Sequence, residues 1–123
     1  MVKPGYKAEV ERKEQLEKEG FHVVRCSGSI GAMDLIGIRW VIGERWEYQP
    51  EKRILFEAVY EQVKKTRSKT FYFNKESKYE LSRLKEITEK FKIPCFFAIK
   101  FTYKGWKIIN VNELDGGPIK YGN

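Results

Sequence analysis

Two runs of β-branched and aromatic residues, 33–41 and about 53–64, constrain the fold of this chain most strongly. Side chains of these types favour the pleated backbone of a β-strand. The segment between the runs, IGERWEYQPEK, contains Gly43 and Pro50, which are typical of turns. The two runs therefore predict a pair of strands joined in a long hairpin.

The remaining segments predict two helices and three further strands. Gly20 is placed to end a first helix that is rich in helix formers. Ser77 and Glu80 have the spacing of a capping box at the start of a second, amphipathic helix, which ends before Pro94. This order predicts a mixed α/β domain with a central sheet. The predicted helices cover 5–19 and about 77–92, and the additional strands cover 21–27, 95–101 and 105–111.

Length and hydropathy set the scale of the fold. The chain has 123 residues, 41% of them hydrophobic, which suits one domain with one modest core. We expect a single domain over 1–123, with its core over about 5–111 and a loose tail over 112–123. No run approaches the ~18 apolar residues of a membrane-spanning helix, and the first residues lack the apolar stretch of a signal peptide. We therefore expect a soluble, cytoplasmic protein with no membrane partner.

The charge balance points to a polyanionic partner. With 24 Lys and Arg against 17 Asp and Glu, the formal net charge is +7, which favours nucleic acid or a membrane surface without choosing between them. The run KKTRSK directly follows the strand predicted at 53–64. Its Lys65, Arg67 and Lys69 are predicted to contact phosphates, which supply most non-specific affinity for DNA. The alternative is an ordinary solvated loop.

Strand periodicity brings a set of polar residues together. Side chains two apart on a strand share a face, so Gln62 and Lys64 project to the same side. An antiparallel hairpin that places Asp34 opposite Gln62 also pairs Trp40 with Phe56, which makes the register self-consistent. Asp34, Gln62 and Lys64 are then expected at one end of one sheet face.

This set has the chemistry of a Mg²⁺ site, because Mg²⁺ prefers oxygen ligands. The same alternation turns Glu57 and Glu61 to the other face, so the amide oxygen of Gln62 becomes the proposed ligand. The backbone carbonyl of Val63 and the carboxylate of Glu9 are candidates to complete the site. An amide brings no charge, so metal affinity is expected to be weaker than with a carboxylate. A lysine two residues after a polar strand residue is also common in proteins without such a site.

The sequence resembles the archaeal Holliday junction resolvases, members of the PD-(D/E)xK nuclease superfamily. The resemblance covers about residues 5–111 and rests on GYKAEVERKEQLEKEGFHVVRCSGS, MDLIGI, EQVKKTRSK, IPCFFAIKF and GWKIINV. It implies a restriction-endonuclease-like mixed β-sheet flanked by helices. The segment WVIGERWEYQPEKR, at about 40–53, makes the hairpin longer than expected for a resolvase.

The resemblance also implies roles in catalysis. Glu9 and Asp34 match the metal-binding acids of the family, and Lys64 matches its catalytic lysine. Gln62 stands where the family usually has glutamate, although other branches of the superfamily, including restriction enzymes similar to Mrr, use a Q-x-K form. The catalytic set is therefore Glu9, Asp34, Gln62 and Lys64, and the metal set is Glu9, Asp34, Gln62 and Val63.

The DNA contacts implied by the resemblance lie around this set. Arg25 and Ser29 match positions that the family uses near the scissile phosphate. The position after Glu9, often arginine in those resolvases, is Val10 here, and Arg12 and Lys13 are expected to supply that charge instead. The predicted DNA-binding residues are Arg12, Lys13, Arg25, Ser27, Ser29, Lys65, Arg67 and Lys69.

These expectations combine into a Mg²⁺-dependent, structure-selective DNA endonuclease, with Mn²⁺ as a substitute metal. The expected substrate is a four-way DNA junction, cut in pairs by a homodimer whose two-fold symmetry matches that of the junction. Two alternatives stay open. One is a nuclease of the same fold that acts on flap, nicked or duplex DNA. The other is a non-catalytic DNA-binding protein in which Gln62 has weakened metal binding.

Overall fold

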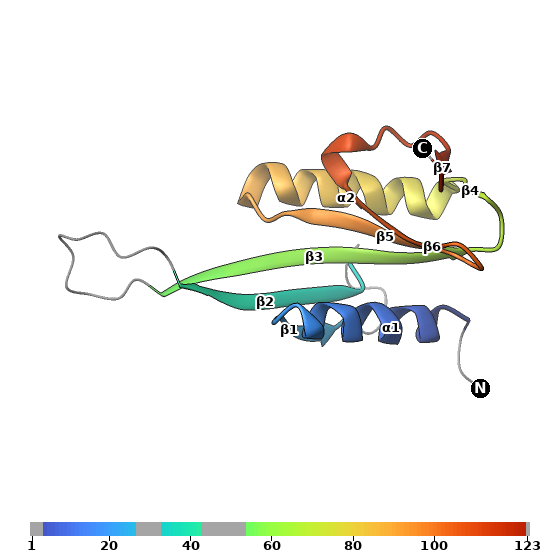
Figure 1. Cartoon of the computed structure of the whole chain (residues 1–123). Helices are drawn as coiled ribbons and strands as arrows, with labels where there is room; N and C mark the ends of the chain where they lie inside the picture. Colours follow the sequence, from blue (N-terminus) through green and yellow to red (C-terminus); the bar gives the residue numbers. More distant parts are fainter. Residues whose placement is uncertain (1–3, 27–32, 43–53, 123) are drawn as a thin grey trace.

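A mixed five-stranded sheet organises the protein. The structure, a computed structural model, describes residues 4–26, 33–42 and 54–122. The sheet has the strand order β1-β2-β3-β5-β6, with α1 on one face and α2 on the other (Figure 1). This arrangement confirms the predicted fold class of a mixed sheet flanked by helices. The predicted hairpin tip at 43–53 and the turn at 27–32 lie outside the described residues.

The elements follow the predicted order closely. Neither described helix combines the length and apolar character needed to cross a membrane. The elements are α1 (Pro4–Lys18), β1 (His22–Arg25), β2 (Leu35–Ile42), β3 (Ile54–Thr66), β4 (Thr70–Phe71), α2 (Lys75–Phe91), β5 (Cys95–Phe101), β6 (Gly105–Asn110), the 3₁₀ turn η1 (Val111–Glu113) and β7 (Ile119–Lys120).

The β2–β3 hairpin has the predicted register. The two strands pair antiparallel along the whole of β2, with Trp40 opposite Phe56. The backbone N–H of Asp34 donates to the carbonyl of Glu61 at 2.8 Å, which extends the ladder one residue beyond β2. The register that pairs Leu35 with Glu61 brings Asp34 next to Gln62, and their side chains bond to each other, as the pattern of the two runs predicted. On its other side β3 pairs parallel with β5, so β3 is the central strand.

Alternating side chains of the sheet build one apolar core under each helix. Val63 of β3 belongs to the core on the α1 side, whereas Tyr60 packs against the core on the α2 side. The α1 core consists of Ala8, Leu16, Phe21, Val23, Leu35, Val59, Val63 and Ala98. The α2 core consists of Phe71, Leu81, Leu84, Cys95, Phe97, Ile99, Phe101, Ile109, Val111, Leu114 and Ile119. Successive side chains of β3 therefore point alternately toward the α1 core and the α2 core.

The first helix ends as its sequence predicted. Gly20 has a φ of +95°, a left-handed conformation that glycine adopts without a steric penalty. Its N–H donates to the carbonyl of Glu17 at 3.0 Å, and the N–H of Phe21 donates to that of Leu16 at 3.1 Å. These two bonds form a Schellman motif. Phe21 and Leu16 also share the α1 core, which fixes the turn into β1.

The start of α2 differs from the prediction. Asn74, in an extended conformation, is the N-cap, and its side chain accepts from the N–H of Ser77 at 2.8 Å. The Ser77 hydroxyl accepts from the N–H of Asn74 at 2.8 Å and completes the box. The predicted box of Ser77 with Glu80 is therefore wrong by one helical turn, because asparagine is among the strongest N-cap residues. Glu80 lies in the second turn and takes no part in capping.

The predicted loose tail also needs correction. After η1 the chain packs back against the sheet, and β7 pairs antiparallel with β4. Leu114 and Ile119 are buried in the α2 core. The glycines and Pro118 indicated a loose segment, but the apolar residues on either side of them are buried members of that core. The described part of 112–122 is thus an ordered component of the fold.

A buried ion pair joins α1 to β3. Arg12, 8% exposed, donates from Nε to one carboxylate oxygen of Glu61 at 2.7 Å and from Nη2 to the other at 3.0 Å. Gln15 accepts a third bond from the guanidinium at 2.9 Å. Glu61 is only 2% exposed, and its bonds to Arg12 place it on the α1 face, opposite the face of Gln62 and Lys64, as strand alternation predicted. The prediction that Arg12 contacts DNA is wrong, because its guanidinium is buried and bound within the protein.

We expect Arg12→Met to lower the free energy of unfolding by about 3–5 kcal/mol, because it leaves the Glu61 carboxylate buried without a partner. The double variant Arg12→Met/Glu61→Met should recover most of this loss, since an apolar pair of similar volume replaces the ion pair. Lys13→Met is the control, because Lys13 lies on the same helix in an exposed pair with Glu17. Urea denaturation measures all three variants. A cost for Arg12→Met no larger than that of the control would contradict the role of the pair.

Candidate active site

One edge of β3 continues past its pairing with β2, at the end of the sheet where α1 and α2 start (Figure 1), and we call this unpaired edge the notch. The β2–β3 pairing begins at Leu35 opposite Glu61, whereas β3 runs on to Thr66. Beyond Glu61, the edge of β3 on the β2 side has no strand partner among the described residues. The N–H of Val63 instead donates to the side chain of Asp34 at 2.9 Å. Because N–H and C=O of one strand residue point to the same side, the Val63 carbonyl faces this notch as well.

Asp34 occupies the centre of the notch. Its Oδ2 accepts from the Val63 N–H and, at 2.8 Å, from the side-chain amide nitrogen of Gln62. Burial, with a smaller contribution from the negative charge of Glu9, raises the pKa of Asp34 to about 6. The Val63 hydrogen bond and the nearby positive charges of Lys64 and Arg25 oppose this rise. This carboxylate is therefore costly to ionise unless a cation comes close.

Gln62 supplies an oxygen but no charge. The residue is 4% exposed, and its amide nitrogen is used by Asp34, which leaves the amide oxygen as the group able to bind a metal. The described residues contain no group of three His, Cys, Asp or Glu side chains arranged around one ion. Asp34 carboxylate, Gln62 amide and Val63 carbonyl are nonetheless all hard oxygen donors. As a donor set they fit Mg²⁺, with one negative charge fewer than a site built on two strand carboxylates.

Glu9 and Arg25 flank the notch on the α1 side. Glu9 projects from α1, and its Oε1 lies 3.7 Å from Nη2 of Arg25 at the end of β1. The guanidinium of Arg25 also lies over the ring of Tyr6, 4.4 Å from its centroid. Within the described part of the chain the buried Nε of Arg25 has no hydrogen-bond partner. Arg25 is thus held beside the notch with a donor still available.

Lys64 faces α2 rather than the α1 side. It shares the face of Gln62, and its Nζ lies 2.6 Å from Oε1 of Glu80 on α2. Lys64 lies on the strand face that the sequence predicted, but the prediction missed its partner Glu80, which it assigned to a helix cap. The available signal was helical phase, because Glu80 lies four residues before the fully buried Leu84 and hence on the same side of α2.

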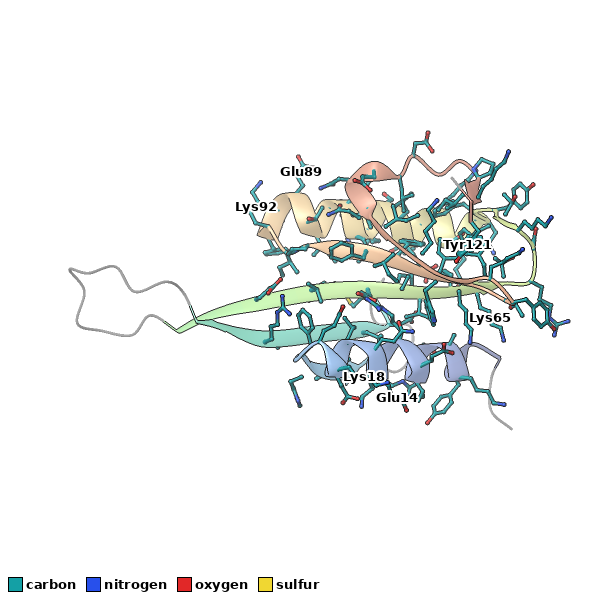
Figure 2. The ribbon with its side chains drawn as sticks, in the orientation of Figure 1. Glu14, Lys18, Lys65, Glu89, Lys92 and Tyr121 are labelled. Carbon is teal, nitrogen blue, oxygen red and sulfur yellow. The ribbon has the colours of Figure 1, made fainter. Side chains whose placement is uncertain are left out.

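The remaining predicted phosphate contacts lie in different parts of the chain. Lys65, Arg67 and Lys69 are exposed at and beyond the end of β3, and Figure 2 labels Lys65 at this end of the molecule. Lys13 lies on α1 in an ion pair with Glu17 at 3.1 Å. The predicted serines, Ser27 and Ser29, fall outside the described residues. The structure therefore gathers three exposed cations next to the notch.

Comparison with known proteins gives a consistent result. The family model described as archaeal Holliday junction resolvase (Hjc) matches residues 1–117. A search of curated proteins found no match. Among solved structures, Hjc from the archaeal hyperthermophile Archaeoglobus fulgidus, a Holliday junction resolvase, superposes with a TM-score of 0.68 at 17% sequence identity. The match covers 98% of this chain and 86% of the Archaeoglobus chain, and it supports a restriction-endonuclease-like fold.

We expect Asp34→Asn to stabilise the metal-free protein at pH 7 by about 1 kcal/mol, because the folded state no longer has to ionise a buried carboxylate. A raised folded pKa means that the folded state binds more protons than the unfolded chain between the ordinary Asp pKa of 3.8 and about 6. Stability should therefore fall as pH rises through this window in the wild type, and fall less in the variant. Asparagine keeps an oxygen that accepts from Gln62 and Val63.

Urea denaturation between pH 4 and 8 in the presence of a chelator measures this difference. Asp115→Asn, at an exposed position in the segment between η1 and β7, is the control and should leave the pH profile of the wild type unchanged. Parallel pH profiles for wild type and Asp34→Asn would contradict the assigned environment of Asp34.

Proposed function

The chain belongs to the archaeal Holliday junction resolvase family, and from this premise we propose that it is a Mg²⁺-dependent endonuclease that cuts four-way DNA junctions. The observation that carries the proposal is the bond between Asp34 and Gln62 where β3 extends past β2, with Lys64 near enough for its positive charge to act on Asp34. An acid, an amide oxygen and an ammonium group lie near one another there, beside exposed cations. Phosphodiester hydrolysis needs this combination of a metal site and a positive charge near the phosphate.

In this proposal Asp34, Gln62 and the Val63 carbonyl hold the metal, and Glu9 approaches from α1. The bound ion supplies an activated water and neutralises charge that develops on the phosphate. Asp34 is poised for this task, because a nearby cation removes the cost of ionising a carboxylate whose pKa is raised. Lys64 places its ammonium group beside the scissile phosphate, where it orients the attacking water and stabilises the added negative charge.

The exposed cations hold the DNA backbone. Arg25, with an unsatisfied donor, lies next to Glu9 at the notch, and Lys65 and Arg67 continue from the end of β3. Contacts of this kind bind phosphates without reading bases, so substrate choice depends on the shape of the junction. A homodimer places two such sites on opposite sides of a two-fold axis, which matches paired cuts in a four-way junction.

One observation favours a second candidate function. Gln62 is neutral, and its amide nitrogen donates to Asp34. The site is therefore poorer in negative charge than one built on two acids. A protein with this site that binds junctions without cutting them is therefore the rival to the enzyme. A nuclease of the same fold that cuts flap, nicked or duplex DNA is the other alternative.

Cleavage of a synthetic four-way junction tests the function. We expect Mg²⁺-dependent paired cuts by the wild type and a loss of at least ~100-fold in rate for Lys64→Ala, since general electrostatic assistance contributes about this much. Lys18→Ala, which removes an exposed charge at the far end of α1, is the control and should cut at the wild-type rate (Figure 2). Linear duplex and flap substrates are assayed in parallel.

Equal rates on all three DNA forms would contradict junction selectivity. Absence of cleavage by the wild type, with junction binding unchanged in Lys64→Ala, would favour the non-catalytic rival.

We expect the double variant Lys65→Ala/Arg67→Ala to bind DNA less tightly and to lower the slope of log affinity against log salt by roughly two, because each lost phosphate contact removes nearly one released counterion. The control is Lys18→Ala/Lys90→Ala, which removes the same formal charge from exposed positions at the last turns of the two helices. Fluorescence anisotropy with a labelled junction at several salt concentrations measures both. Equal slopes for the two double variants would assign the effect to net charge alone.

A further inference from the structure

We propose that Glu80 of α2 is a positioning residue for Lys64 and supplies the negative charge that Gln62 does not. The proposal rests on the function proposed above in that Lys64 is taken as the lysine that acts on the phosphate. It adds a residue from a helix to a site otherwise formed by the sheet and α1. Glu80, on the helix that covers this face of the sheet, replaces the carboxylate that β3 lacks at position 62.

The contact between the two side chains is close and sheltered. Nζ of Lys64 lies 2.6 Å from Oε1 of Glu80, and the side chains are 21% and 13% exposed. A lysine side chain has four rotatable bonds, and a close ion pair with a sheltered carboxylate favours the conformations in which its ammonium group lies against α2. The pair joins β3 to α2. The position of α2 therefore sets the direction of Lys64.

Glu80 has no other task in the helix. The N-terminal capping box of α2 is complete with Asn74 and Ser77. Across Lys75–Phe91, Glu80 is the acidic residue that faces the sheet, whereas Glu76, Glu86 and Glu89 are exposed. Burial raises the pKa of Glu80, and the Lys64 ammonium opposes that rise. An acid placed on the buried face of a helix is costly, and its contact with Lys64 offsets that cost.

The charges of the site support the same role. Gln62, two residues before Lys64 on the same strand face, is neutral, so β3 gives this ammonium no carboxylate at the nearest position. With Glu80 included, the set of Asp34, Gln62, Lys64 and Glu80 has the same formal charge as a strand with glutamate at position 62 and no helix acid. The negative charge of Asp34 also acts on Glu80, which places the two carboxylates within electrostatic range of each other.

The first test uses the metal-free protein without DNA and measures the acetylation rate of Lys64 by peptide mass spectrometry. We expect Glu80→Gln to speed acetylation of Lys64 about fivefold, because the ammonium group loses the contact that holds and shields it. Glu86→Gln is the matched control, since Glu86 lies on the same helix in an exposed pair with Arg83 at 3.0 Å. The double variant Glu80→Gln/Gln62→Glu should return to nearly the wild-type rate, because it moves the acid from α2 to β3.

The second test uses Mg²⁺ as the probe in isothermal titration calorimetry. We expect Mg²⁺ to bind more weakly to Glu80→Gln than to the wild type, and the double variant to recover that affinity. Unchanged Lys64 acetylation in a folded Glu80→Gln protein would overturn the positioning role, and unchanged Mg²⁺ affinity would overturn the charge role. If Glu80→Gln does not fold, Glu80→Asp replaces it, because it withdraws the carboxylate by one methylene and should also expose Lys64.

Neither readout depends on cleavage. A wild-type protein that cuts no junction would remove the proposed function, yet the acetylation and calorimetric results would still decide whether Glu80 holds Lys64. Conversely, junction cleavage that survives in Glu80→Gln with unchanged Lys64 acetylation would leave the proposed function standing and remove the role of Glu80.

Discussion

Side-chain alternation along β3 decides what each residue at this end of the sheet can do. Glu61 points toward α1 and forms the buried ion pair with Arg12, whereas Gln62 points to the opposite face and donates a hydrogen bond to Asp34. A shift of one residue would bring a carboxylate to the notch and bury an amide against an arginine. The register of the β2–β3 hairpin excludes that exchange, because Asp34 is bonded through its main chain to Glu61 and through its side chain to Val63.

The stability of the fold and the chemistry of the notch therefore depend on different residues of β3. On the α1 face the Arg12–Glu61 pair is fully bonded and links the helix that carries Glu9 to the central strand. At the notch Asp34 is half-buried with a pKa raised to about 6, which opposes stability at neutral pH unless a cation is bound. A metal ion that binds there would remove the cost of ionising the buried Asp34 carboxylate, which strengthens its binding. This is the pattern expected when a functional site sits on a well-packed support.

The sequence was sufficient for the strands, the hairpin register and the meeting of Asp34 with Gln62, because these follow from short periodicities. It was not sufficient for Glu80 or Arg12, since their roles depend on how each helix is rotated against the sheet. The α2 start was misplaced because Asn74 and Ser77 offered a better cap than the later Ser77 and Glu80. The tail was misjudged because glycine and proline content conceals apolar residues whose partners are distant in sequence.

Above all, we propose that a divalent metal binds where β3 extends past the end of β2. Crystals of the protein grown with Mn²⁺ and measured at the manganese absorption edge test it directly. We predict an anomalous peak bonded to oxygens of Asp34 and Gln62 and to the carbonyl of Val63, at about 2.1–2.3 Å. A peak held by other residues, or no peak at saturating Mn²⁺, would contradict this proposal. Gln62 would then serve only as a hydrogen-bond donor to Asp34.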